Sequence, residues 1–84
     1  MEVTPYFERN VLANPDRLGI TKEMCEEVVA NPEHRATQED GRTVYWRQQE
    51  GGELYLRVVV TADGTALHNA FFDSNYTRKR RRDG

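Results

Sequence analysis

The stretch from Glu53 to Thr61 constrains the fold of this chain more than any other, because its residues alternate with a period of two. One side carries Leu54, Leu56, Val58 and Val60, and the other carries Tyr55, Arg57 and Val59. Such alternation is typical of a strand with one buried face. Turn signals flank the stretch, with Gly51-Gly52 before it and Asp63-Gly64 after it. The pattern therefore predicts a central strand that is paired on both edges.

Length and composition predict that this strand belongs to one small domain. The chain has 84 residues, of which 37% are hydrophobic and 31% are charged, as in a globular protein with a single modest core. No apolar run approaches the roughly 18 residues of a membrane span, so no membrane association is expected, and Met1–Thr4 does not begin a signal peptide. Cys25 is the single cysteine. Since it has no partner for an internal disulfide, we expect a reducing, cytoplasmic location.

Charge is distributed unevenly along the chain. Residues 1–77 hold seven basic and thirteen acidic side chains, a formal charge of −6, whereas residues 78–84 carry a formal charge of +4. The basic residues of this last segment are Arg78, Lys79, Arg80, Arg81 and Arg82. We expect residues 1–77 to form a single domain and residues 78–84 to be a disordered basic tail, because like charges repel and nothing apolar anchors them. Such a tail indicates either an acidic partner or a solvated terminus.

Two helices are predicted in the first part of the chain. Thr4-Pro5 reads as an N-cap followed by proline at the first helical position, which begins a helix that extends to about Ala13. Thr21 caps a second helix, and Asn31-Pro32 ends it. Residues 1–4 form a possible short edge strand.

After Pro32 the period changes to two, which predicts three further strands over residues 35–39, 43–49 and 65–72. Together these elements predict an α+β domain, in which both helices pack on one face of a four-stranded antiparallel meander. The apolar face of this sheet is predicted to contain Val44, Trp46, Leu54, Leu56, Val58, Val60, Leu67 and Phe71.

The lengths of the hairpin loops decide which side chains share the outer face of this sheet. A three-residue loop at residues 50–52 pairs Trp46 with Leu56 and unites the apolar face, whereas a two-residue loop pairs Trp46 with Arg57 and divides it. We therefore expect the three-residue loop, which places Tyr45 and Arg47 beside Tyr55 and Arg57 on the outer face. In the last hairpin a two-residue loop adds His68 to this face, and a three-residue loop adds Asn69 instead. The sequence leaves these two alternatives open.

The outer face carries residue types that suit RNA chemistry. Arginines hold phosphates, aromatic rings stack on bases, and a histidine moves a proton near neutral pH. Arg57 and His68 are the candidate catalytic residues. The candidate RNA-binding residues are Tyr45, Arg47, Tyr55, Arg78, Lys79, Arg80, Arg81 and Arg82. A solvated sheet face, on which arginine and tyrosine pair across strands, is the alternative.

The sequence contains no Gly-rich phosphate loop and no metal-ligand spacing, so neither a cofactor nor a metal is expected. His34 and His68 are the only histidines, and they lie far apart in the sequence.

Short motifs along residues 4–73 resemble a family of small uncharacterised bacterial domains. They are Arg17-Leu18-Gly19-Ile20-Thr21, Ala30-Asn31-Pro32, Gln38-Glu39-Asp40-Gly41-Arg42, Tyr45-Trp46, residues 56–60 with Asp63-Gly64, and residues 68–73. That family is thought to lie near the BrnT-like and RelE-like toxins of toxin–antitoxin pairs. In many relatives a histidine opens the first helix, where this chain has Tyr6.

The resemblance implies a toxin-like endoribonuclease that works without a metal and has an antitoxin protein as a partner. The alternative is a non-enzymatic interaction module whose basic tail binds RNA or an acidic protein.

Overall fold

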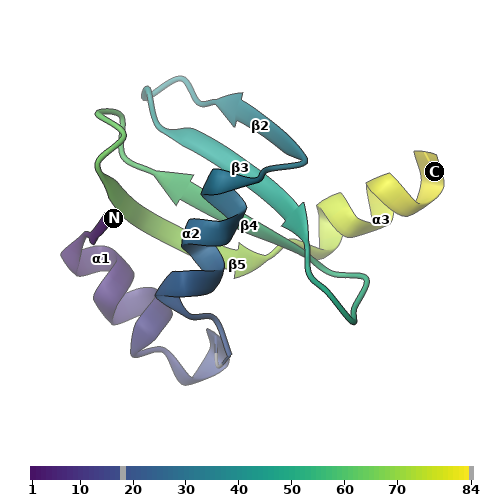
Figure 1. The fold of residues 1–84 in the computed structure, drawn as a ribbon, viewed down its shortest axis with the longest axis horizontal. Coiled ribbons are helices and arrows are strands. Elements are labelled where there is room, and N and C mark those ends of the chain that lie inside the picture. The colour runs from purple at the N-terminus through teal and green to yellow at the C-terminus, as the bar shows by residue number, and fades with distance from the viewer. Residues whose placement is uncertain (18, 84) are drawn as a thin grey trace.

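A computed structural model describes residues 1–17 and 19–83, which form an α+β fold built on a five-stranded sheet (Figure 1). The strands are β1 (Glu2–Val3), β2 (His34–Thr37), β3 (Thr43–Gln48), β4 (Tyr55–Val60) and β5 (Ala66–Phe72). Their order in the sheet is β1-β5-β4-β3-β2. Strands β2 to β5 form the predicted antiparallel meander, and β1 joins the edge of β5 in parallel. The sheet is therefore mixed, with β4 at its centre as the sequence predicts.

The helices lie where the caps predict them, although the first helix is irregular. Helix α1 (Pro5–Phe7) continues as the π-helical segment η1 (Glu8–Leu12), and η2 (Pro15–Arg17) is a short 3-10 turn. Helix α2 (Lys22–Ala30) begins after Thr21, whose hydroxyl accepts a hydrogen bond from the Met24 amide. Figure 1 shows α1 and α2 on the same side of the sheet. Among the described residues no helix combines the length and the apolar character needed to cross a bilayer.

The main core lies between these helices and the sheet. Strand β4 contributes Leu56, Val58 and Val60, which are buried against residues of α1, η1 and α2. The other buried members of this core are Phe7, Val11, Ile20, Cys25, Val28, Leu67 and Ala70. Burial raises the pKa of Cys25 to about 12, so the residue is a packed thiol rather than a reactive thiolate. We call this side of the sheet the inner face and the opposite side the outer face.

The pairing of β3 with β4 differs from the predicted one by one residue. Trp46 pairs with Arg57 and Tyr45 pairs with Val58. Trp46 therefore lies on the outer face, whereas Tyr45 packs against the inner core. The expectation that Trp46 and Leu56 share one buried face is wrong. Leu54, another expected core residue, is 45% exposed.

The shift has a physical cause, because the sheet buries apolar residues on both faces. Val44, Tyr55 and Val59 are buried on the outer face although they do not belong to the inner core. Placing Trp46 there also gives its indole N–H a partner, since Nε1 donates to the Asp73 carboxylate at 3.1 Å. Dividing the apolar residues between two faces therefore leaves neither set in water.

Helix α3 (Ser74–Asp83) stands where the sequence predicts a disordered tail from residue 78. Asp73 caps its start, because its carboxylate accepts a hydrogen bond from the Tyr76 amide at 2.9 Å. Thr77 fixes the first turn: its hydroxyl accepts from the Tyr55 amide at 3.0 Å and donates to the Asp73 carbonyl at 2.8 Å. The basic residues then occupy the last turns, where positive charge complements the helix dipole. Figure 1 shows α3 extending away from one end of the sheet.

Candidate nucleic-acid interface

A β-bulge in β5 places both candidate residues of the last hairpin on the outer face. Val59 pairs with Asn69 and Val60 pairs with Leu67, so His68 is the extra residue between the two pairs. Such an extra residue re-aims the side chains around it. His68 and Asn69 therefore line the same pocket, an arrangement that neither of the two alternative loops predicts.

This pocket is open to solvent and has a volume of about 260 Å³. We call it the outer pocket. Its lining comes from the start of α1, from the β2–β3 turn and from strands β4 and β5. The lining residues are Tyr6, Gln38, Arg42, Arg57, Val59, His68 and Asn69. Two arginines and one histidine thus line a single hollow. No carboxylate is among the lining residues, although Arg42 Nη1 forms an ion pair with the Asp40 carboxylate at 3.3 Å.

His68 is held in this pocket by contacts from the N-terminal segment. Its Nδ1 lies 3.2 Å from the hydroxyl oxygen of Thr4, and its ring stacks on Tyr6 with the centroids 5.0 Å apart. Partial burial lowers the pKa of His68, and the positive charge of Arg42 lowers it further, against a smaller opposing effect from Asp40. Both main causes favour the neutral imidazole, which is the form that accepts a proton.

The orientation of the Asn69 amide follows from its two hydrogen bonds. The amide oxygen accepts from Arg17 Nη1 at 2.7 Å and from the Ala70 amide at 2.9 Å. Since both partners are donors, the oxygen must face them, and the NH₂ group takes the opposite side. Arg17 also donates to the Ala70 carbonyl at 3.2 Å and lies over the Phe71 ring. Asn69 therefore presents a donor whose direction is fixed.

Arg57 connects the outer pocket with a row of aromatic residues. Its guanidinium carbon lies 5.1 Å from the Phe71 centroid and 5.9 Å from the Trp46 ring, and its Nε is 4.0 Å from Asp73. The pairing of β2 to β5 places His34, Trp46, Arg57 and Phe71 side by side across four strands. A ligand that reaches Arg57 can therefore contact both the pocket and the aromatic rings.

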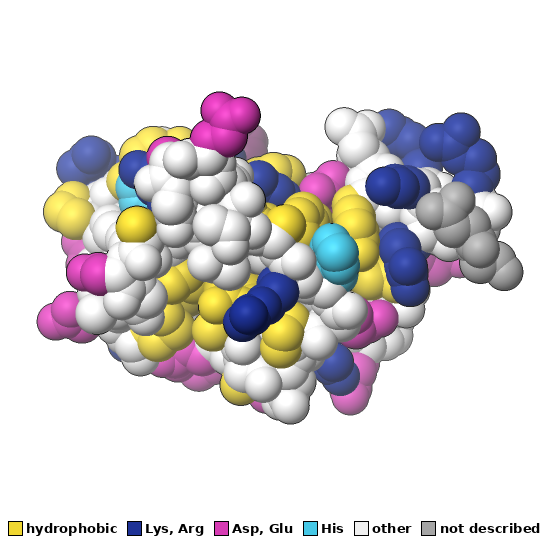
Figure 2. Space-filling view, turned by 90° about the horizontal axis from the view of Figure 1, so that it is seen from above, with side chains coloured by type: hydrophobic (Ala, Val, Ile, Leu, Met, Phe, Trp, Pro, Cys, Tyr) yellow, Lys and Arg dark blue, Asp and Glu magenta, His cyan; other side chains and the backbone are white. Residues whose placement is uncertain are grey.

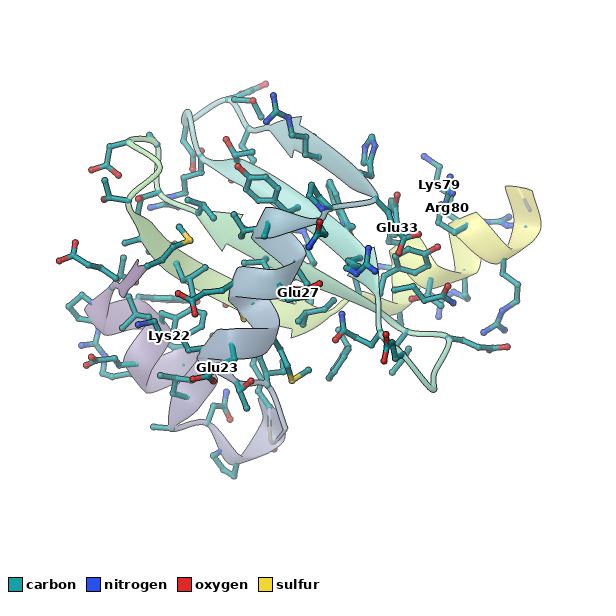
Figure 3. The ribbon with its side chains drawn as sticks, in the orientation of Figure 1. Lys22, Glu23, Glu27, Glu33, Lys79 and Arg80 are labelled. Carbon is teal, nitrogen blue, oxygen red and sulfur yellow. The ribbon has the colours of Figure 1, made fainter. Side chains whose placement is uncertain are left out.

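Basic side chains gather next to this row, on α3. Figure 2 shows lysine and arginine side chains over α3, with a histidine and hydrophobic side chains beside them. Arg81 forms an ion pair with Glu53, and a hydrogen bond to the Tyr55 hydroxyl raises the pKa of Arg80. In Figure 3 Lys79 and Arg80 lie on the side of α3 near Glu33. Two residues of the last turn of α3 thus lie near Glu53 and Tyr55, and all five basic residues from Arg78 to Arg82 are exposed.

The structure groups only part of the predicted site. Arg57 and His68 line one pocket, and Tyr55 lies on the outer face near α3. Tyr45 and Arg47 do not join them, because the shifted register turns both to the inner face. This corrects the grouping that the three-residue loop predicts.

Arg47 lies beside the acidic side of α2 instead. It lines a groove with Glu23, Glu27 and Glu50, and its Nη1 donates to the Asn31 carbonyl at 3.0 Å. Figure 3 shows Lys22, Glu23 and Glu27 on α2, in front of the sheet. These carboxylates would repel a phosphate, so Arg47 belongs to a surface unlike the outer pocket.

The outer face also carries residues that are not among the sequence candidates, and these include Tyr6, His34, Arg42, Trp46 and Tyr76. Arg42 and Tyr6 lie on turns or helix starts that only the folded chain brings to the pocket. The three-residue loop predicts Trp46 in the core. Tyr76 lies two residues before the basic run, so an aromatic residue close to basic residues is the available signal.

Comparisons with family models, with curated proteins and with solved structures find no match to this chain. Within residues 1–17 and 19–83, no three or more His, Cys, Asp or Glu side chains come together in a way that could hold a metal ion.

Proposed function

We propose that this protein is a toxin-like endoribonuclease that cleaves RNA at the outer pocket without a metal. The observation that carries the proposal is the meeting of His68 with Arg42 and Arg57 in one open hollow. An imidazole with a lowered pKa beside two arginines suits a substrate that is a phosphodiester with an adjacent hydroxyl group. RNA supplies both, since its 2′-hydroxyl is a built-in nucleophile.

In the proposed reaction His68 acts as the general base. When Nδ1–H donates to Thr4 Oγ1, the lone pair of Nε2 is free to take the proton of the 2′-hydroxyl. The 2′-oxygen then forms a bond to phosphorus, and the bond from phosphorus to the 5′-oxygen breaks. Water in the open pocket protonates the leaving 5′-oxygen, and the hydroxide that remains takes back the proton that His68 received. The products are a 2′,3′-cyclic phosphate and a 5′-hydroxyl.

Arg42, Arg57 and Asn69 stabilise the charge that develops on the phosphoryl oxygens. The arginines act as cationic donors, and the oriented amide of Asn69 adds a neutral donor. Loss of one such donor typically lowers kcat by about 10²- to 10³-fold. Arg17 is a positioning residue in this scheme, because it acts only through Asn69.

The experiment is a gel assay of RNA cleavage in the presence of EDTA. We expect the wild-type protein to cut, and His68→Gln and Arg57→Gln each to lose at least about 10²-fold in rate. Asn69→Asp is expected to lose activity as well, since it keeps the contact with Arg17 but places a negative charge in the pocket. Circular dichroism establishes that each variant is folded.

Arg47→Gln is the matched control for Arg57→Gln, because it removes the same group from the opposite face of the same sheet. Its cleavage rate should equal that of the wild type. Cleavage that needs a metal, or that survives both His68→Gln and Arg57→Gln, would contradict the proposed site.

The resemblance to toxins suggests that expression of the active protein arrests growth and that a small antitoxin protein relieves the arrest. His68→Gln should then be harmless at the same expression level. The exposed basic residues of α3 favour a second candidate, a non-enzymatic module that binds RNA or an acidic protein. Binding by a folded wild-type protein that cleaves no RNA, with or without ribosomes, would favour this module.

A further inference from the structure

We propose that His34, Trp46, Tyr55 and Tyr76 form a stacking site for a nucleobase of single-stranded RNA at the start of α3. We call these four residues the aromatic cluster. The inference rests on the proposed function, because it names the form of RNA that the outer pocket receives.

The rings of the cluster are arranged as a compact group with one exposed member. Trp46 and Tyr76 are stacked with centroids 4.9 Å apart and planes 18° apart, and Tyr55 meets Tyr76 edge-on at 5.1 Å. His34 lies 5.2 Å from Trp46 and 6.1 Å from Tyr76, nearly parallel to the latter. Since His34 is exposed and Tyr55 is buried, the cluster meets solvent at His34.

Asp73 fixes the cluster before any ligand arrives. Its carboxylate accepts a hydrogen bond from the Trp46 indole through one oxygen and from the Tyr76 amide through the other. A site that is already ordered loses little conformational entropy on binding. The aromatic cluster therefore has the rigidity that a stacking platform needs.

The charges around the cluster identify the chemistry of its ligand. Arg57 lies beside Trp46, and Arg80 lines a pocket with Tyr55. Both nearby carboxylates are engaged: Asp73 accepts from Trp46 and lies 4.0 Å from Arg57, and Glu33 accepts from the Gln48 amide at 2.7 Å. A quaternary ammonium ligand would meet these guanidinium groups and be repelled. A nucleotide has both a flat π-face and a phosphate, so it matches the rings and the cations together.

The form of the nucleic acid follows from access to the bases. Bases inside a duplex are covered by their neighbours, whereas the bases of single strands, loops and bulges can stack on protein side chains. Arg57 belongs to the outer pocket and also lies beside Trp46. A strand whose phosphate occupies the pocket thus has an adjacent base at the aromatic cluster, and its next phosphates near α3.

Trp46 is the single tryptophan of the chain and therefore reports on the cluster directly. The probe is a fully 2′-deoxy oligonucleotide of mixed sequence, which the proposed reaction cannot cleave. We expect the single strand to quench Trp46 fluorescence, and the same strand annealed to its complement to quench it much less.

The affinity test uses a labelled copy of the same single strand with two variants of β2. His34→Ala should weaken binding by roughly 5- to 150-fold, the range expected for one lost stacking contact. Thr37 lies at the other end of the same short strand, so Thr37→Ala should leave the affinity unchanged. Both positions are exposed, so neither change should disturb the fold.

The results separate this inference from the proposed reaction. Equal quenching by single strand and duplex, or equal binding by the wild type and His34→Ala, would overturn the stacking site and leave binding to the charges of α3. Selective quenching by a protein that cleaves no RNA would retain the stacking site and overturn the reaction. Cleavage of RNA by a protein whose Trp46 fluorescence is not quenched would retain the reaction and overturn the stacking site.

Discussion

His68 is the general base of the proposed reaction, and its surroundings determine the pH range in which it can accept a proton. Partial burial and the nearby Arg42 charge lower its pKa below the ordinary value of 6.5. A general base works in its deprotonated form, so this shift increases the reactive fraction at neutral pH. The ring keeps its orientation through Thr4 and Tyr6, both from the N-terminal segment.

The pH profile of cleavage should reflect this shift. We expect kcat/KM to rise with pH below 6.5 and to be level above it, because protonation of His68 removes the base. Arg42→Gln should move the rising limb to higher pH, since it removes a charge that lowers the His68 pKa. A rate that falls as pH increases from 5 to 7 would contradict the role of general base.

The position of His68 could be predicted from the sequence only in part. The alternation of β5 could place either His68 or Asn69 on the outer face, and Arg57 on that face was predicted correctly. A bulge breaks the period of two, and its energy depends on long-range packing that one strand does not reveal. The two residues therefore share a pocket that neither hairpin loop predicts.

At the scale of elements, the order and approximate bounds of the four meander strands and of α2 could be predicted from caps, turns and periodicity. The parallel pairing of β1, which makes the sheet five-stranded and mixed, could not. The register of β3 could not be predicted either, because uniting all apolar residues on one face favours the pairing of Trp46 with Leu56. The correct place of Trp46 depends on Asp73 and Tyr76, which lie after the last strand. The helix that contains Tyr76 was in turn missed, since its basic run has no apolar stripe.

The register makes a specific prediction about stability. Leu56→Ala should reduce the free energy of unfolding by roughly 2–5 kcal/mol, because Leu56 is fully buried in the inner core. Trp46→Phe should cost less, since Trp46 is only partly buried and phenylalanine retains the stacking on Tyr76. Urea denaturation of the two variants measures the difference. A larger loss for Trp46→Phe than for Leu56→Ala would contradict the observed placement.

At the scale of the whole molecule, an acidic body carries a basic helix at one end. The −6 charge of residues 1–77 repels nucleic acid, while the five basic residues after Thr77 attract it. The outer pocket lies on the body, and α3 projects beyond the sheet (Figure 1). We infer that α3 draws the strand toward the outer face and that the pocket acts on it there.

Removal of the residues after Thr77 tests whether α3 binds the strand. Truncation should weaken binding of the single strand and flatten the dependence of log Kd on log salt by up to roughly 3.5, because each lost phosphate contact contributes about 0.7. Fluorescence titrations at several salt concentrations give both quantities. An unchanged slope would mean that the basic residues do not contact the strand.

The central claim is that the outer pocket directs the 2′-hydroxyl of RNA against its own phosphate. The most direct measurement is mass spectrometry of the fragments from a single-stranded RNA in EDTA, beside an otherwise identical strand with one 2′-deoxy nucleotide at the cut position. We predict fragments with a 2′,3′-cyclic phosphate and a 5′-hydroxyl from the first strand, and no cut at that position in the second. Fragments with a 5′-phosphate, cutting of the deoxy position, or intact RNA would contradict the claim.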